Sequence, residues 1–384
     1  MNEVSLADQQ AAKPLNKSLT AHGPEACASP VKKTIANQPR AREKIRPGAA
    51  QYSSKVSLPV EPVPVILTID AEVAPHTSDW KRDRGRFAID RDIFGITDRG
   101  ERGLRYQLEV IEQHGLKAVV FLEALSTSVV GTDLLKELVT LVQLRGHEVA
   151  LHIHTEWLPY LPRPLVGDRR GRYMHDFSED DQRRIMDQGL ENLSRAGAER
   201  VVAFRAGNAG ASLETLRAAL RSGIRIDSSY FAPFLNRSCR LPSHPEISQA
   251  IPLEGVIEIP ITWFRDGLGR IRPAQLCACS VGEFEHLLGR AWTDGWRIIT
   301  LLLHSFELVR RYSPERPQTV VRLHERRLLR LCQLLAANAE KFVSKTFGEL
   351  DTENILADPQ PSCLRSPLGQ TIWRYLEQAT GRVW

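Results

Sequence analysis

The strongest constraint on the fold of this chain is a repeat of short apolar segments, each followed by a segment with helical periodicity. Seven apolar segments recur, at residues 65–69, 117–122, 149–153, 201–204, 224–226, 256–259 and 297–303. Between two of them, Leu134, Leu135, Leu138, Leu141 and Val142 fall at the spacing of one helix face. Near-continuous apolar strands that alternate with helices indicate an α/β fold with a parallel sheet covered on its outer face. Seven such units favour a closed or nearly closed barrel.

An open, doubly wound sheet is the alternative architecture. It is less favoured because no glycine-rich dinucleotide turn follows the first strand. We expect three regions: a disordered basic tail at 1–60, the barrel at 61–350, and a helical or loop extension at 351–384. The tail is predicted from its six prolines and its lack of apolar periodicity.

Charge and composition exclude several functions. Residues 1–55 contain nine Lys/Arg and four Asp/Glu, which accounts for the whole net charge of +5. Neither a basic helix nor basic residues interleaved with aromatic ones appear, so we expect no nucleic-acid partner. No apolar run reaches the roughly 18 residues of a membrane span, and the first residues lack the apolar stretch of a secretory signal. The six cysteines have no framework spacing, so reduced thiols and a cytoplasmic location are expected.

Reactive side chains fall at or just beyond the carboxyl ends of the predicted strands. In a parallel barrel these ends open on one rim, where such folds build active sites. Helices and loops of the opposite rim would receive many of these residues if their placement were random. The residues are Asp70, Glu72, His152, His154, Arg205, Asp227 and His304.

The histidine-containing strand has the residue types of a metal site. His152 and His154 alternate with apolar residues, so both imidazoles point to one face, and Glu156 follows closely. Imidazole and carboxylate groups within this reach can hold a divalent cation. The alternative is that these are hydrogen-bonded histidines at a strand end.

The other rim residues have the chemistry of hydrolysis. Asp70 and Glu72 are two apart and can point the same way, so one can bind a cation while the other accepts a proton from water. Arg205 can hold a carboxylate such as Asp70 through its forked donors, although a structural salt bridge is the alternative. His304 can donate a proton to a leaving group, although a buried structural histidine would also fit.

Five segments resemble, in order, the motifs of the polysaccharide deacetylase family, metal-dependent sugar N-deacetylases (carbohydrate esterases with the chitooligosaccharide-deacetylase homology domain). The resemblance covers roughly residues 62–345 and implies a distorted (β/α) barrel of about seven parallel strands. The segments are Thr68–Glu72, Gly146–His152, Phe204–Asn208, Gly223–Ser229 and Leu302–His304.

Two departures from the family pattern concern the metal ligands. Ala71 stands where the family has its second aspartate, so the metal carboxylate would be Glu72. Glu156 stands where the family has its second metal histidine, so either Glu156 or His154 would complete the set with His152. The implied cofactor is a divalent metal ion: zinc first, with manganese, iron or cobalt as alternatives.

The resemblance implies hydrolysis of an acetamido group on a sugar or glycan precursor. The predicted catalytic residues are Asp70 as base, Arg205 holding it, His304 as acid, and Asp227. Trp157 and Trp263 could stack on a sugar ring, although lone aromatics are more often part of the packing. The alternatives are a metal-dependent hydrolase of a non-sugar amide, or an inactive barrel that binds glycan.

Overall fold

The computed structural model describes residues 61–73, 75, 79–243, 246–310, 318–357 and 360–381. The chain divides into two units, Met1–Val56 and Ser57–Trp384, and all the described residues belong to the second. The predicted disordered tail, residues 1–60, lies outside the described residues.

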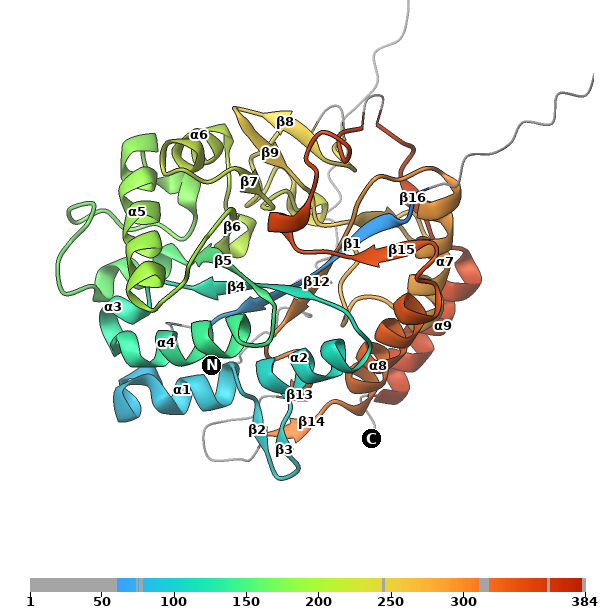
Figure 1. Ribbon diagram of the computed structural model, residues 1–384, viewed down its shortest axis with the longest axis horizontal. Helices are drawn as coiled ribbons and strands as arrows, with labels where there is room; N and C mark the ends of the chain where they lie inside the picture. The colour runs from blue at the N-terminus through green and yellow to red at the C-terminus, as the bar shows by residue number, and fades with distance from the viewer. Residues whose placement is uncertain are drawn as a thin grey trace, which may run out of the picture. The chain divides into compact units, whose positions relative to one another are not determined.

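All seven predicted strands are present and lie side by side in one sheet (Figure 1). In spatial order they are β12 (Ile299–His304), β1 (Val63–Ala71), β4 (Ala118–Glu123), β5 (Glu148–Ile153), β6 (Ala203–Ala206), β7 (Ile226–Asp227) and β9 (Val256–Glu258). Every neighbouring pair in this series is parallel. The expectation of a parallel α/β sheet of about seven strands is therefore confirmed.

Two short strands extend this sheet. β8 (Ile251–Leu253) runs antiparallel to β9, and β15 (Phe342–Ser344) runs parallel to the first residues of β1. Four further pairings lie outside it: β2 (Ile96–Thr97) with β3 (Gly100–Glu101), β10 (Trp263–Arg265) with β11 (Ile271–Pro273), β10 with β16 (Leu364–Arg365), and β13 (Val309–Arg310) with β14 (Thr319–Val320).

An irregular segment after β9 connects the two ends of the curled sheet. The amide of Thr262 donates to the carbonyl oxygen of Thr300 in β12 at 3.0 Å. Leu302, also in β12, donates its N–H to Ala274 O at 3.0 Å and accepts from Leu276 N at 3.1 Å. The barrel is thus distorted, because this side of its wall is completed by single hydrogen bonds from a segment outside the regular strands.

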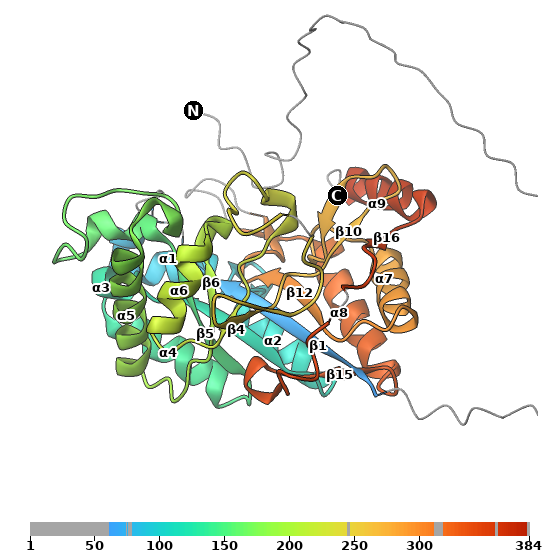
Figure 2. The ribbon, with the colours of Figure 1, turned by 90° about the horizontal axis from the view of Figure 1, so that it is seen from above.

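Helices cover the outer face of the sheet. Figure 2 shows α5 and α6 at the left of the view and α7, α8 and α9 at the right. Among the described residues, no helix is long and apolar enough to cross a membrane. The helices are α1 (Arg86–Asp92), α2 (Leu104–Gln113), α3 (Thr127–Val130), α4 (Thr132–Gln143), α5 (Glu179–Arg195), α6 (Leu213–Arg221), α7 (Val281–Thr293), α8 (Arg322–Ala337) and α9 (Leu368–Gly381).

Local sequence explains where two of these helices begin. The Ser178 hydroxyl accepts from the amide of Asp181 at the start of α5. At the start of α7, Ser280 and Glu283 form a complete capping box, in which each side chain accepts from the other residue's amide. Both helices therefore start where their capping residues satisfy amides that lack helical partners.

The alternation of side chains along the strands gives the barrel an apolar floor and a polar mouth. In β1, Val65, Leu67 and Ile69 belong to the large core under the helices, whereas Ile66 belongs to a second core inside the sheet. That inner core also contains Val119, Phe121, Ala150 and Ala203 from the neighbouring strands. Since side chains repeat every second residue, the next inward positions along these strands receive polar residues.

Candidate active site

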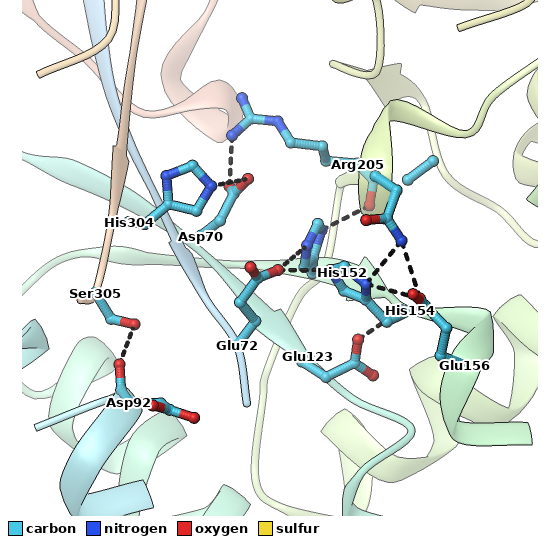
Figure 3. A network of polar contacts seen from close by, with 12 residues as sticks. Asp70, Glu72, Asp92, Glu123, His152, His154, Glu156, Arg205, His304 and Ser305 are labelled. Carbon is cyan, nitrogen blue, oxygen red and sulfur yellow. Dashed lines mark hydrogen bonds and ion pairs between the residues drawn. The ribbon is translucent and has the colours of Figure 1, made fainter. Parts of the chain in front are cut away.

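Strand register brings the predicted residues together. Asp70 in β1 is level with His304 in β12, and His152 in β5 is level with Arg205 in β6. Glu123, the last residue of β4, is level with His152 from the other side. Figure 3 shows that these side chains converge on one region at the carboxyl ends of the strands.

Glu72, His152 and His154 form a cluster that could hold a metal ion. One ligand atom from each lies within 4.8 Å of the other two. Glu72 Oε2 is 3.1 Å from His152 Nε2 and 2.5 Å from His154 Nε2. Two imidazole nitrogens and one carboxylate oxygen are the donor set of several catalytic zinc sites, which leave a further position open. The residues present therefore fit a divalent cation.

Each imidazole of the cluster is oriented through its other ring nitrogen. His152 donates from Nδ1 to the carbonyl oxygen of Arg205 at 2.9 Å. His154 Nδ1 lies 3.1 Å from Glu156 Oε2, and this Glu156 oxygen also accepts from Asn208 Nδ2 at 2.9 Å. Such outer partners fix the tautomer and the ring direction of metal-binding histidines. The structure thus places Glu156 behind His154, and its carboxylate is not part of the three-atom cluster.

The cluster is electrostatically tight. Burial alone would raise the pKa of Glu72, but the charge of His154 and hydrogen bonds from both imidazoles hold that pKa well below its usual range. Burial alone would likewise lower the pKa of His154, but the charge of Glu72 and hydrogen bonds to Glu156 and Glu72 hold it well above its usual range. The site therefore favours an ionised Glu72 carboxylate, which is the form that binds a cation, and a protonated His154, which must lose its Nε2 proton before that nitrogen can bind one.

Glu123 supports the cluster from beneath, and sequence reasoning missed it. Its Oε2 accepts from the amide of His154 at 2.5 Å, and its Oε1 accepts from the amide of Leu125 at 2.8 Å. Burial raises the pKa of Glu123 to about 7, against the opposing charges of His154 and His152. Its place at the carboxyl end of a strand was the available signal, but a single glutamate there suggests no particular partner.

Asp70 and Arg205 form a buried ion pair beside the cluster. Arg205 Nη1 donates to Asp70 Oδ1 at 2.5 Å, and both side chains are under a tenth exposed. The remaining donors are also used: Nη1 reaches Thr68 Oγ1 at 3.1 Å, while Nε and Nη2 reach the carbonyl oxygen and hydroxyl of Ser228. The guanidinium lies over the Phe121 ring, 4.1 Å from its centroid. Arg205 therefore fixes one carboxylate oxygen of Asp70 and leaves Oδ2 directed elsewhere.

His304 faces that second oxygen. Its Nε2 is 4.0 Å from Asp70 Oδ2, and its Nδ1 is 3.1 Å from Glu307 Oε1. Gln275 donates to the same Glu307 oxygen. Burial alone would lower the pKa of His304, but the hydrogen bond and charge of Glu307, together with Asp70 and Glu72, raise it to about 9. Sequence reasoning missed Glu307, although it stands only three residues after His304 in the turn beyond β12.

Asp227 is not part of this group of contacts. It is fully buried, and its two oxygens accept from the amide and the hydroxyl of Ser229. Its neighbour is Glu258, level with it in β9. Burial raises the pKa of both carboxyls, and that of Glu258 is held well above its usual range by the adjacent Asp227 charge. These contacts hold the Ser228–Ser229 turn that grips Arg205, while a catalytic role for Asp227 stays a prediction.

The tryptophans suggested for sugar stacking are buried. Trp157 is 0% exposed and packs edge-on against Trp80 at 5.5 Å between ring centroids. Trp263 is 1% exposed and donates its indole N–H to Ile247 O. The stacking expectation is therefore wrong for both, because each ring fills core space beside the rim.

Comparison with known proteins finds similarity in structure. No family model and no curated protein matches the chain. A suspected polysaccharide deacetylase from Mycobacterium smegmatis matches with a TM-score of 0.47 at 17% identity, covering 79% of this chain and 97% of that one. A family 4 carbohydrate esterase from Streptomyces lividans matches with a TM-score of 0.33 at 10% identity, covering 80% and 98%. A CE4-family pseudoenzyme from Bacillus anthracis matches with a TM-score of 0.35 at 12% identity, covering 81% and 70%.

At these identities the similarity concerns the fold. These structures are what the chain is similar to, over about four fifths of its length.

Proposed function

We propose that this chain is a metal-dependent amide hydrolase that removes the acetyl group from an N-acetylated sugar. The observation that carries the proposal is the convergence of three metal-type ligand atoms, within 4.8 Å of one another, at the mouth that also holds Asp70, Arg205 and His304. The sugar as substrate class rests on the five-motif resemblance.

We assign Glu72, His152 and His154 as the metal ligands, and Glu156 as the residue that orients His154. The assignment follows from which atoms face one another: the Nε2 atoms of both histidines face Glu72, while Glu156 bonds to Nδ1 of His154. A bound divalent cation supplies Lewis acidity, which lowers the pKa of water and polarises an amide carbonyl.

Asp70 is the group that accepts the proton from the attacking water. Arg205 occupies Oδ1, so Oδ2 is the oxygen that can take the proton. The water oxygen bonds to the acetyl carbon as the carbon–nitrogen bond breaks.

His304 provides the proton that the departing amine needs. Because its pKa is raised to about 9, it carries a proton on Nε2 at neutral pH, and it stands across from Asp70. The products are acetate and the free amino sugar, and the proton taken by Asp70 restores the charge balance lost at His304.

The direct test is acetate release from N-acetylhexosamine substrates by purified protein, with and without chelator, alongside elemental analysis. We expect release that requires metal and falls by about 10²–10⁴-fold in Asp70→Asn, which is the usual contribution of proton transfer by a positioned base. Turnover only of non-sugar amides would indicate the alternative hydrolase. Tight metal binding without turnover of any amide would indicate an inactive glycan-binding protein and refute the proposal.

Metal content tests the ligand assignment separately from activity. His154→Ala should lose most of the metal, whereas Glu156→Gln should retain it with affinity lowered by about 10–100-fold, the usual cost of an outer partner. His114→Ala, a histidine bonded to its own helix carbonyl, is the matched control. Equal, full occupancy in His154→Ala and Glu156→Gln would remove both from the site.

A further inference from the structure

The last helix, α9, is turned inside out relative to an ordinary surface helix. Its outward residues are large and apolar: Leu368 (48% exposed), Ile372 (51%), Trp373 (55%), Tyr375 (39%) and Leu376 (54%). These are half of the ten exposed large hydrophobic residues found in the described part of the chain. Apolar residues on a surface helix normally face the core, so this face calls for an explanation.

The inward face of α9 is polar and locks the helix in this orientation. Arg374 has no exposed side-chain surface, and its guanidinium donates to Glu283 Oε1 at 2.8 Å and to Asp266 Oδ2 at 2.9 Å. Both partner carboxylates are equally buried. Rolling the helix to hide its apolar face would break this buried pairing and leave charged groups buried without partners, which is strongly destabilising.

A third ion pair and a backbone contact also hold the helix in this orientation. Arg327 on α8 donates to Glu377 Oε2 at 2.9 Å, and the amide of Gly267 donates to Thr371 Oγ1 at 2.9 Å. Gly267 also lies directly against Leu368, where a Cβ would come within 2.3 Å of the Leu368 Cα. The next residue, Leu268, is 56% exposed and adds to the apolar surface. We call α9 with Leu268 the apolar ridge.

The ridge is too small to hold two copies of the chain together by itself. A 14-residue helix is about 21 Å long and about 10 Å wide, so one face offers roughly 200 Å² per copy. Two copies would bury about 400 Å², well under the roughly 1,200 Å² of a stable interface. A second copy is therefore disfavoured as its occupant.

Two exposed basic side chains lie close to the ridge. Exposed Arg270 approaches the ridge, with Nη1 3.2 Å from the Tyr375 hydroxyl, and exposed Arg365 lies just before the helix. The acidic residue of α9, Glu377, is partly buried: its Oε2 is paired with Arg327, and its Oε1 accepts from the indole N–H of Trp373 at 2.9 Å. An apolar face that carries tryptophan and leucine beside arginines is the pattern of helices that lie in a membrane interface and favour anionic lipids.

We propose that the apolar ridge docks this chain on the surface of an anionic lipid bilayer, with α9 lying in the plane of the interface. Leu268 and the outward residues of α9 insert among the acyl chains near the headgroups, and Arg270 and Arg365 contact lipid phosphates. The proposal does not depend on the hydrolase activity.

Vesicle sedimentation tests this with the full-length protein. Wild type should bind vesicles of phosphatidylcholine mixed with phosphatidylglycerol, should bind pure phosphatidylcholine more weakly, and should be released by salt. The double variant Ile372→Ser/Leu376→Ser should bind at least about tenfold more weakly for each side chain replaced. The matched control, Ile96→Ser/Leu144→Ser, removes two exposed apolar residues from other elements and should bind like wild type.

Trp373 provides a second readout. Lipids with brominated acyl chains should quench part of the tryptophan fluorescence of wild type. That quenched part should be missing from the fluorescence of Trp373→Phe. Vesicle binding that is absent in wild type, or equal in the ridge variant and its control, overturns the proposal. A second result would also overturn it: the free protein self-associates in light scattering, the ridge variant alone abolishes this self-association, and vesicles have no effect. The ridge would then join copies of the chain.

Discussion

Replacing Glu307 by glutamine should lower the pKa of the His304 imidazole. Glu307 bonds to Nδ1 at 3.1 Å and is the leading cause, against burial, of a rise from 6.5 to about 9. That rise of about 2.5 pK units corresponds to about 3 kcal/mol in favour of the protonated ring. Glutamine can keep an oxygen at the Oε1 position; it removes the charge and places an amide NH2 group where Oε2 was. Because an opposite charge at this distance shifts a pKa by about 1–3 units, we expect a fall of that size.

NMR titration of the His304 ring in chelator-treated protein measures this shift directly. The kinetic counterpart is the alkaline limb of kcat/KM, because a general acid must be protonated and activity falls as pH rises through its pKa. In Glu307→Gln this limb should move to lower pH, with activity retained on its acidic side. Glu325→Gln, a glutamate bonded to Arg102 and Tyr106, is the matched control. A His304 midpoint and an alkaline limb that both stay at their wild-type positions would refute the reasoning.

Three further substitutions test the supporting contacts. Glu258→Gln should be more stable than wild type by about 1 kcal/mol or more at pH 8 and should lose that advantage near pH 4.5. The reason is that the pKa of Glu258 is raised in the folded protein, so wild-type stability falls as pH rises above the pKa of the unfolded chain. Urea unfolding at both pH values measures the difference, and equal differences at the two pH values would contradict the prediction. Arg205→Lys should lower kcat/KM by about 10²-fold while the circular dichroism spectrum stays native, because a lysine ammonium cannot reach all the oxygens that the guanidinium of Arg205 contacts. Activity near that of wild type would show that Asp70 does not need to be held by Arg205. Glu123→Gln turns a side-chain NH2 group toward a backbone N–H, either that of His154 or that of Leu125. It should lower the free energy of unfolding by about 1–3 kcal/mol and weaken metal binding, measured by competition with a chelator. Unchanged metal affinity would show that Glu123 does not support His154.

The sequence was sufficient to predict the sheet because its signal is local and repeated. Each apolar segment lies between helix and turn signals, and parallel strands bring their carboxyl ends to one rim regardless of loop detail. Thus Asp70, His152 and Arg205 could be placed on that rim without knowing how long β6 or β7 would be. β7 has only two residues in the structure, too few for periodicity to define its ends.

The supporting residues could not be predicted, since each depends on a distance across the fold. Glu123 reaches the amide of a residue 31 positions later, and Gln275 reaches Glu307 through the irregular segment that completes the barrel wall. The role of Glu156 also required geometry, because sequence spacing allowed it to be a ligand as readily as His154. The outward face of α9 escaped notice for a related reason: its helical pattern predicts one apolar side but does not say that the buried side is the charged one.

Both imidazoles of the cluster come from one extended stretch, two positions apart, with ring centroids 5.0 Å from each other. The backbone pleat, and not the path of a connecting turn, therefore sets their separation. Among the described residues, the stretch from Leu158 to Arg170 supplies no ligand atom, whereas Arg172 pairs with Glu156 behind His154. Insertions or substitutions in this stretch could change substrate selectivity while leaving the metal ligands in place, which makes it the natural place to re-engineer selectivity.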